Sequence, residues 1–79
     1  MKTIYEYSYI RLIGCLRAAH EKAGLTQAQA ARCVGMSRAW VGKIERREIG
    51  LDVLHFAVLC RAYRQRPSRL LRSLDEEPP

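Results

Sequence analysis

Apolar side chains recur at intervals of three and four along most of the chain, the spacing that gathers side chains on one face of an α-helix. One stripe includes Ile13 and Leu16, and another runs from Val53 to Tyr63. The pattern predicts helices over about residues 8–23, 26–34, 37–47 and 52–64, with a short fifth helix starting at Pro67. The predicted class is therefore all-α, a compact domain of five helices.

The first nine residues fit two patterns. Tyr5, Tyr7 and Tyr9 alternate with polar residues, and a period of two suits a short strand that pairs with a partner chain. The same tyrosines can instead extend the apolar stripe of the first helix. We favour a helix from about Ser8 with the tyrosines packed on it, and a contribution of these residues to a dimer contact is a further alternative.

Local signals mark how the two middle helices begin and end. Thr26 is an N-cap candidate, and Gln29 three residues later completes a capping-box pattern. Gly35 is suited to end that helix, because glycine adopts the left-handed conformation at little cost. Ser37 is positioned to cap the next helix. Residues 26–46 are therefore predicted to form a helix, a tight turn and a second helix.

The second of these helices has two unlike faces. Val41 and Ile44 are three residues apart and share an apolar face. The opposite face and the end of the helix carry basic and aromatic side chains, namely Arg38, Trp40, Lys43, Arg46 and Arg47. A helix that is apolar inside and basic outside is suited to the major groove of double-stranded DNA, which admits one α-helix.

The positive net charge of the chain favours a polyanionic binding partner. The 79 residues contain 14 Lys and Arg against 8 Asp and Glu, a formal net charge of +6. Three of the acidic residues fall at positions 75–77, so residues 1–74 carry 14 basic and 5 acidic side chains, a net of +9. Such a field attracts nucleic acid. We expect residues 1–74 to form one DNA-binding domain and residues 75–79 to be a disordered acidic tail.

Other classes of function have little support in the sequence. Cys15, Cys33 and Cys60 lack metal-ligand spacing, and each lies in a helical apolar pattern, so buried, reduced thiols are expected. His20 and His55 have no set of acid and base partners in a pocket, and neither a paired carboxylate nor a metal motif occurs, so no enzyme activity and no cofactor or metal are expected. Because neither a signal-peptide pattern nor a bilayer-spanning apolar run is present, we expect a cytoplasmic protein with no membrane partner.

From Thr26 to Arg46 the chain reads T-Q-x-x-x-A-x-x-x-G-x-S-x-x-x-V-x-x-I-E-R. This motif resembles that of the Cro/repressor-type (lambda-repressor-like, XRE-type) helix-turn-helix DNA-binding family, and the resemblance extends from about Leu16 to Leu71. It implies the lambda-repressor-like fold, with residues 37–47 as the helix that reads DNA. Relatives usually have a glycine after this motif, where this chain has Arg47, so the exit loop is expected to differ and the helix to run longer.

The resemblance also assigns roles to residues. The family's base-contacting positions correspond to Arg38, Ala39 and Lys43, with Trp40 beside them. Phosphate contacts are expected from residues at the ends of the two helices and on their outer face, namely Thr26, Gln27, Arg32, Ser37, Arg46 and Arg47. The helix 4–5 region usually forms the dimer contact in relatives, which here indicates Tyr63, Leu70, Leu71 and Leu74.

Two positions depart from the family pattern. Trp40 replaces a residue that is usually small or polar, and either it contacts DNA or it packs back over Arg32 and the preceding helix. His20 stands where relatives commonly have an arginine that pairs with the glutamate of the motif. A His20–Glu45 pair is therefore expected, with Arg17 as the alternative partner one turn earlier.

These observations lead to one main hypothesis and one alternative. The main hypothesis is a sequence-specific transcriptional regulator, a homodimeric repressor that binds a near-palindromic operator and regulates its own gene. The alternative is an antitoxin-type interaction protein that binds a partner protein, a toxin or an inducer, and autoregulates its operon.

Overall fold

The computed structural model describes residues 4–76, with side chains from Glu6 onward. In that range the chain forms α1 (Ile4–Ala23), α2 (Gln27–Val34), α3 (Arg38–Glu45), α4 (Val53–Ala62), α5 (Pro67–Leu71) and the 3-10 helix η1 (Arg72–Asp75). No strand occurs among residues 4–76, which confirms the all-helical, five-helix prediction. Within the same residues, no helix combines the length and apolar character needed to span a membrane.

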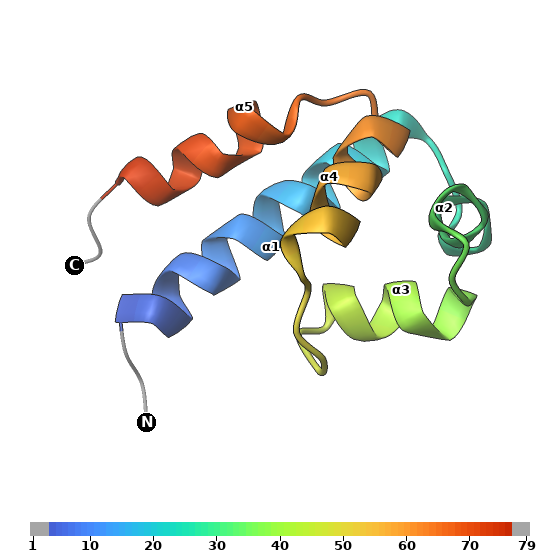
Figure 1. The fold of residues 1–79 in the computed structure, drawn as a ribbon, viewed down its shortest axis with the longest axis horizontal. Helices are drawn as coiled ribbons and strands as arrows, with labels where there is room; N and C mark the ends of the chain where they lie inside the picture. The colour runs from blue at the N-terminus through green and yellow to red at the C-terminus, as the bar shows by residue number, and fades with distance from the viewer. Residues whose placement is uncertain (1–3, 77–79) are drawn as a thin grey trace.

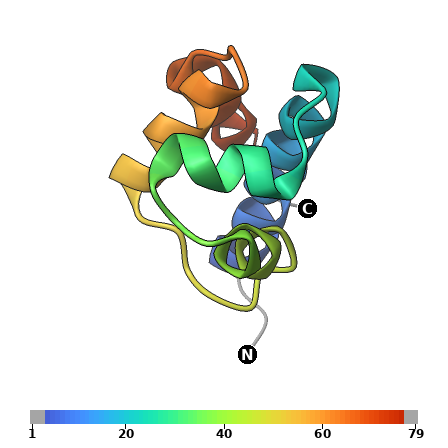
Figure 2. The same cartoon turned by 90° about the vertical axis from the view of Figure 1, so that its right-hand side faces the viewer.

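The helices surround one core, and α1 runs the length of the molecule (Figure 1). The α5 helix and η1 pack along α1, whereas α2 packs against both α3 and α4. In both views α3 forms one edge of the molecule, and α5 with the C-terminal end of α4 forms the opposite edge (Figures 1 and 2). The helix predicted to read DNA is therefore a peripheral element backed by the others.

Side chains from all five helices meet in the core. The residues with the least exposed surface include Ile13 and Leu16 of α1, Val41 and Ile44 of α3, and Leu59 of α4, each 1% exposed. On α2 the core positions are small, since Ala30 and Ala31 are 0% and 2% exposed. Small side chains let α2 approach its neighbours closely, which fixes its distance from α3.

Local signals placed most helix ends correctly. The Thr26 hydroxyl accepts from the Gln29 backbone N–H at 3.1 Å, and the Gln29 side chain accepts from the Thr26 N–H at 2.8 Å, so the capping box is complete. Ser37 and Asp52 cap α3 and α4 in the same way. Gly35 takes φ 71°, the left-handed conformation predicted for it.

The N-terminal segment differs from the prediction. The first helix begins at Ile4 rather than near Ser8, so the strand alternative is wrong for residues 4–9. Tyr9 packs half-buried against the core, and the Tyr7 hydroxyl accepts a bond from Arg11 at 3.3 Å. Tyr9 therefore extends the apolar stripe of Ile13 and Leu16 toward the start of the helix. The Tyr5 side chain lies outside the described residues.

The predicted acidic tail does not begin at Asp75. That residue belongs to η1, and the Glu76 carboxylate lies 2.9 Å from the Arg11 guanidinium, which ties the end of η1 to α1. Residues 77–79, the rest of the predicted tail, lie outside the described residues.

Three apolar positions are more exposed than their spacing suggested. Cys15 and Cys33 are exposed, so the expectation of buried thiols was wrong for both and holds for Cys60. Val53, on the predicted core stripe of α4, is 69% exposed. Spacing alone could not exclude these positions, because each lies at the edge of a helical face rather than at its centre.

Candidate nucleic-acid interface

The outer face of α3 is free, whereas its inner face is fixed in the core. The side chains of Arg38, Ala39 and Lys43 are exposed, and Val41 and Ile44 on the other side are each 1% exposed. The Ser37 hydroxyl accepts from the Trp40 backbone N–H at 3.1 Å and fixes where the helix begins. The three predicted base-reading side chains therefore extend outward from a rigid helix.

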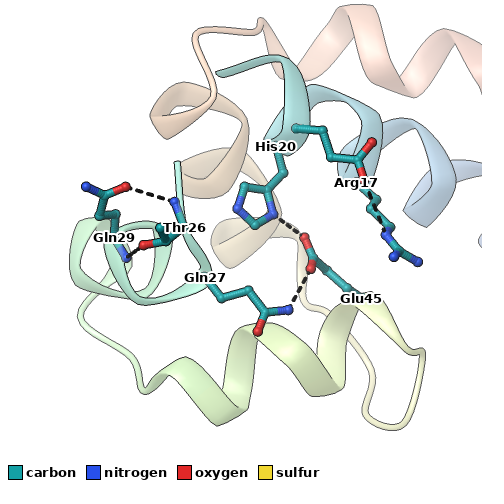
Figure 3. A network of polar contacts seen from close by, with 7 residues as sticks. Arg17, His20, Thr26, Gln27, Gln29 and Glu45 are labelled. Atoms are coloured by element: carbon teal, nitrogen blue, oxygen red, sulfur yellow. Dashed lines mark hydrogen bonds and ion pairs between the residues drawn. The ribbon is translucent and has the colours of Figure 1, made fainter. Parts of the chain in front are cut away.

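A buried polar network ties α3 to α1 and α2 (Figure 3). Glu45, 9% exposed, lies with one carboxylate oxygen 2.5 Å from Nδ1 of His20, which is 6% exposed. Its other oxygen accepts from the Gln27 side-chain amide at 3.1 Å. The network therefore fixes the C-terminal end of α3 from two directions. This confirms the His20–Glu45 prediction, and Arg17 pairs instead with Glu21 at 3.9 Å.

Tyr63 completes this network from α4. Its ring stacks on the His20 ring with centroids 4.9 Å apart and an angle of 8° between the planes. Burial, together with the nearby Glu45 carboxylate, raises the pKa of the Tyr63 phenol well above its ordinary value. The uncharged phenol ring therefore packs against the imidazole of His20 and holds it in position.

Gln27 supports α3 through its side chain. Its N–H₂ group donates to Glu45, and its predicted phosphate contact stays a prediction. A phosphate contact at this end of α2 would also use the backbone N–H groups of the first helical turn, which lack partners within the helix. Thr26 is exposed there, and its hydroxyl proton is free to be donated while the oxygen accepts the capping bond.

Trp40 packs on α4, which neither alternative anticipated. Its ring lies 5.1 Å from the His55 ring, centroid to centroid, at an angle of 59°. Nδ1 of His55 is in turn 2.6 Å from an Asp52 carboxylate oxygen. Bonds from the His55 backbone and ring lower the pKa of Asp52. Trp40 is half-buried, whereas Arg38 and Lys43 on the same helix are exposed.

This contact of His55 with Trp40 could not be predicted from the sequence. The contact depends on how α4 packs beside α3, and no spacing within one helix reports that. The capping motif of Asp52 was the one available signal, since it places His55 in the first turn of α4.

At the end of α3, Arg47 occupies the position where the family usually has a glycine. Arg47 itself takes the left-handed conformation, with φ 60°. The backbone N–H of Arg47 donates to Ile44 O at 3.0 Å, and that of Glu48 donates to Lys43 O at 2.8 Å. These two bonds form a Schellman ending, so α3 stops at Glu45 and the prediction of a longer helix was wrong.

Arg46 and Arg47, which follow α3, differ in their ion pairs. Arg46 pairs with Glu48 through its guanidinium, and a bond from Arg46 lowers the pKa of the Glu48 carboxyl. Arg46 also lies over Gly42, where an added Cβ would be 3.0 Å from its Nη1 and 3.7 Å from the Gln27 amide nitrogen. The structure therefore brings Gln27, Gly42 and Arg46 together. Arg47 is exposed and forms no ion pair within residues 4–76.

The remaining predicted contacts are exposed cations. Arg32, Arg38 and Lys43 form no ion pairs with other described residues, and all three are exposed. Lys43 is close enough to Glu48 for its charge to help lower the pKa of that carboxyl, whereas the charges of Arg32 and Arg38 are available to a polyanion. In the described part of the chain, no group of three or more His, Cys, Asp or Glu side chains is arranged to hold a metal ion.

Two predicted dimer-contact residues belong to the core. Tyr63 is 2% exposed and Leu70 is 7% exposed, because both pack inward on α1. They cannot meet a partner chain while the domain is folded, so this part of the prediction was wrong. Leu71 is half-buried and Leu74 is 43% exposed, which leaves these two available at the surface.

The comparisons with known proteins agree with this geometry. The family model for a helix-turn-helix domain matches residues 11–74. A solved structure described as an XRE-family like protein from Pseudomonas syringae pv. tomato str. DC3000 is similar, with a TM-score of 0.86 and 35% sequence identity. That match covers 91% of this chain and 88% of the other. No curated protein matches the chain.

Proposed function

The chain belongs to the XRE-type helix-turn-helix family of DNA-binding regulators, and we propose that it is a homodimeric repressor that reads a near-palindromic operator with α3. One observation carries the proposal. The exposed side chains of Arg38, Ala39 and Lys43 extend from a helix whose other face is locked by the core and by the buried Glu45 network.

Base reading is assigned to those three residues. Arg38 is suited to a bidentate contact with O6 and N7 of guanine, and Lys43 offers a more flexible donor. Ala39 is suited to contact a thymine methyl group. Trp40 packs on His55 and so has a fixed position from which its exposed edge can contact the sugar or a methyl group.

Phosphate binding is assigned to the residues around α3. Ser37 caps the start of α3, Arg46 and Arg47 follow its end, and Thr26 and Arg32 belong to the start and the last turn of α2. Arg47 is the stronger candidate of the two arginines, because Arg46 is already partly neutralised by Glu48. These contacts set affinity and register rather than sequence preference.

Dimerisation is assigned to Leu71 and Leu74, together with Ile10, which is 42% exposed. Two copies would place their recognition helices about 34–36 Å apart, one turn of DNA. Repression then follows from steric exclusion at the operator, in the cytoplasm, without a further surface.

The test selects bound sequences from random duplexes and measures anisotropy on the selected duplex and on a scrambled one. We expect at least about 1000-fold preference for the selected duplex, in dimer steps. Arg38→Ala should remove about 1–3 kcal/mol of that discrimination. Arg17→Ala is the matched control, since Arg17 is an exposed arginine of α1 outside the proposed contacts. Equal, weak binding to both duplexes would refute the operator hypothesis.

A further inference from the structure

A second group of cations lies outside the proposed DNA contacts. Between Val53 and Leu74 the chain has no acidic residue, yet it carries five arginines, Arg61, Arg64, Arg66, Arg69 and Arg72. All five are exposed, and none pairs with an acidic residue of the described part of the chain. Nothing in the proposed reading of DNA by α3 uses them.

The arginines belong to elements far from α3. The C-terminal end of α4, the following loop and α5 lie at the opposite edge of the molecule from α3 in both views (Figures 1 and 2). A duplex held against α3 therefore lies on the other side of the domain. Arg61, Arg64, Arg66 and Arg69 belong to these elements, and Arg72 begins η1.

Two adjacent hollows give this region a defined geometry. One, of about 300 Å³, is lined by Lys22 of α1 and Arg69 of α5, with Gln65 between them. The other, of about 160 Å³, is lined by the same Lys22 and Gln65 together with Arg64. Three cations and one amide from α1, the α4–α5 loop and α5 therefore converge on neighbouring hollows.

This chemistry suits phosphate groups. Guanidinium groups bind phosphate oxygens bidentately, and an ammonium group adds a compact point charge. The floor of the larger hollow includes Ala18 and Ala19, whose small side chains leave room for a phosphate to approach the cations. Lys22 has no ion-pair partner within residues 4–76, so an incoming anion would not have to displace one.

We propose that Lys22, Arg64 and Arg69, extended by Arg61, Arg66 and Arg72, form a second basic surface that binds the backbone phosphates of a second nucleic-acid segment. The inference goes beyond the operator reading proposed for α3. Nucleic acid is favoured over an acidic protein because the cations form an extended series, which matches a polymer with regularly repeated charges. Both hollows also have apolar lining residues, Cys15, Ala18, Ala19 and Leu70 in the larger and Ala23 and Tyr63 in the smaller, so the choice of nucleic acid is carried by the charge of the cations.

The first experiment isolates this surface from α3. Arg38→Ala/Lys43→Ala removes the proposed base contacts and serves as the background. Binding of a random duplex is measured by anisotropy across a salt series for two proteins. One is this background variant, and the other carries Lys22→Gln/Arg64→Asn/Arg69→Gln in addition. We expect at least a tenfold loss of affinity at low salt. The slope of log K against log salt should fall by about 2.7, since each phosphate contact contributes about 0.9.

The matched control, Arg17→Gln, removes an exposed charge of α1 that belongs to neither proposed surface, and it is compared with Arg69→Gln alone. This control should change the slope by less than one phosphate contact. Melting followed by circular dichroism checks that each variant folds. If the triple variant does not fold, Arg69→Gln alone should still lower the slope by about 0.9. An unchanged slope in the folded variants would overturn the proposal and leave the surface to an acidic protein partner.

The second experiment separates the two possible sources of phosphate. Inorganic phosphate is titrated into the background variant bound to the random duplex, with sodium chloride at equal ionic strength as the reference. Equal displacement by the two salts supports a nucleic-acid surface. Much stronger displacement by phosphate, dependent on Lys22, Arg64 and Arg69, would overturn it in favour of a small phosphorylated ligand.

The two proposals can fail independently. If Arg38→Ala/Lys43→Ala keeps its preference for the selected duplex, the proposal that α3 reads the operator is refuted, and the salt series still tests the second basic surface.

Discussion

Replacing His20 with alanine tests how the recognition helix is held. The change leaves the carboxylate of Glu45 buried, 9% exposed, with only the Gln27 amide as its partner. Removing one partner of a buried pair costs roughly 3–5 kcal/mol, because the other charge stays desolvated. Loss of the stacked ring on Tyr63 is included in the same range, since contributions within one network are not additive. We expect a loss of about 3–5 kcal/mol.

Such a loss is large for this domain. Small domains are stable by roughly 5–15 kcal/mol, so the variant should be close to its unfolding threshold. The assay is urea unfolding followed by circular dichroism. With a slope of about 1 kcal/mol per molar urea, the midpoint should fall by about 3–5 M or the variant should be unfolded in buffer.

A matched control and a double substitution identify the cause. Arg17→Ala, three residues earlier on α1, breaks an exposed pair and should cost at most about 1 kcal/mol. His20→Ala combined with Glu45→Gln should cost clearly less than the sum of the two single changes, because no buried charge is then left unpaired. A loss below about 1 kcal/mol in His20→Ala would refute the reasoning that this pair holds α3.

Three further predictions follow from other parts of the structure. Gly14→Ala should stabilise the domain by up to about 1 kcal/mol, measured as a higher melting temperature, since an added Cβ meets nothing within 4 Å in the middle of α1; a lower melting temperature would contradict this. Cys15 and Cys33 should react with a thiol reagent at pH 8, whereas Cys60 should react only on unfolding, because burial raises its thiol pKa to about 11. The lowered pKa of Asp52 means that its cap stabilises α4 above the ordinary carboxyl pKa and that this contribution is lost as pH falls through the lowered value. Melting of Asp52→Asn against the parent from pH 7 to pH 2 should therefore show a difference that shrinks in acid, and a constant difference would argue against the charged cap.

Local chemistry explains which features could be predicted from the sequence. Thr26, Ser37 and Asp52 begin helices because a side-chain oxygen meets a backbone N–H a few residues away, and this needs no knowledge of the rest of the fold. The exposed positions Arg38 and Lys43 follow from helical spacing in the same way. The His20–Glu45 pair was accessible through the resemblance, which supplied the contact between distant residues.

Tertiary packing decided what could not be predicted. Trp40 turns toward His55 because α4 lies beside α3, and neither helix alone encodes that neighbour. Tyr63 and Leu70 are apolar residues in the region where relatives dimerise, and sequence could not tell a core residue from an interface residue of the same chemistry.

The left-handed arginines give the fold a further property. Helices α1 and α2 end at glycines with φ of 73° and 71°, whereas the chain after α3 and after α4 takes the same conformation at Arg47 and Arg64, each with φ 60°. A glycine would relieve about 1 kcal/mol of backbone strain at each arginine. At these two turns, selection for thermal stability alone would favour glycine, and selection for contact with nucleic acid would favour arginine. A laboratory evolution experiment under heat, without a binding requirement, would be expected to exchange these arginines before any residue of the core.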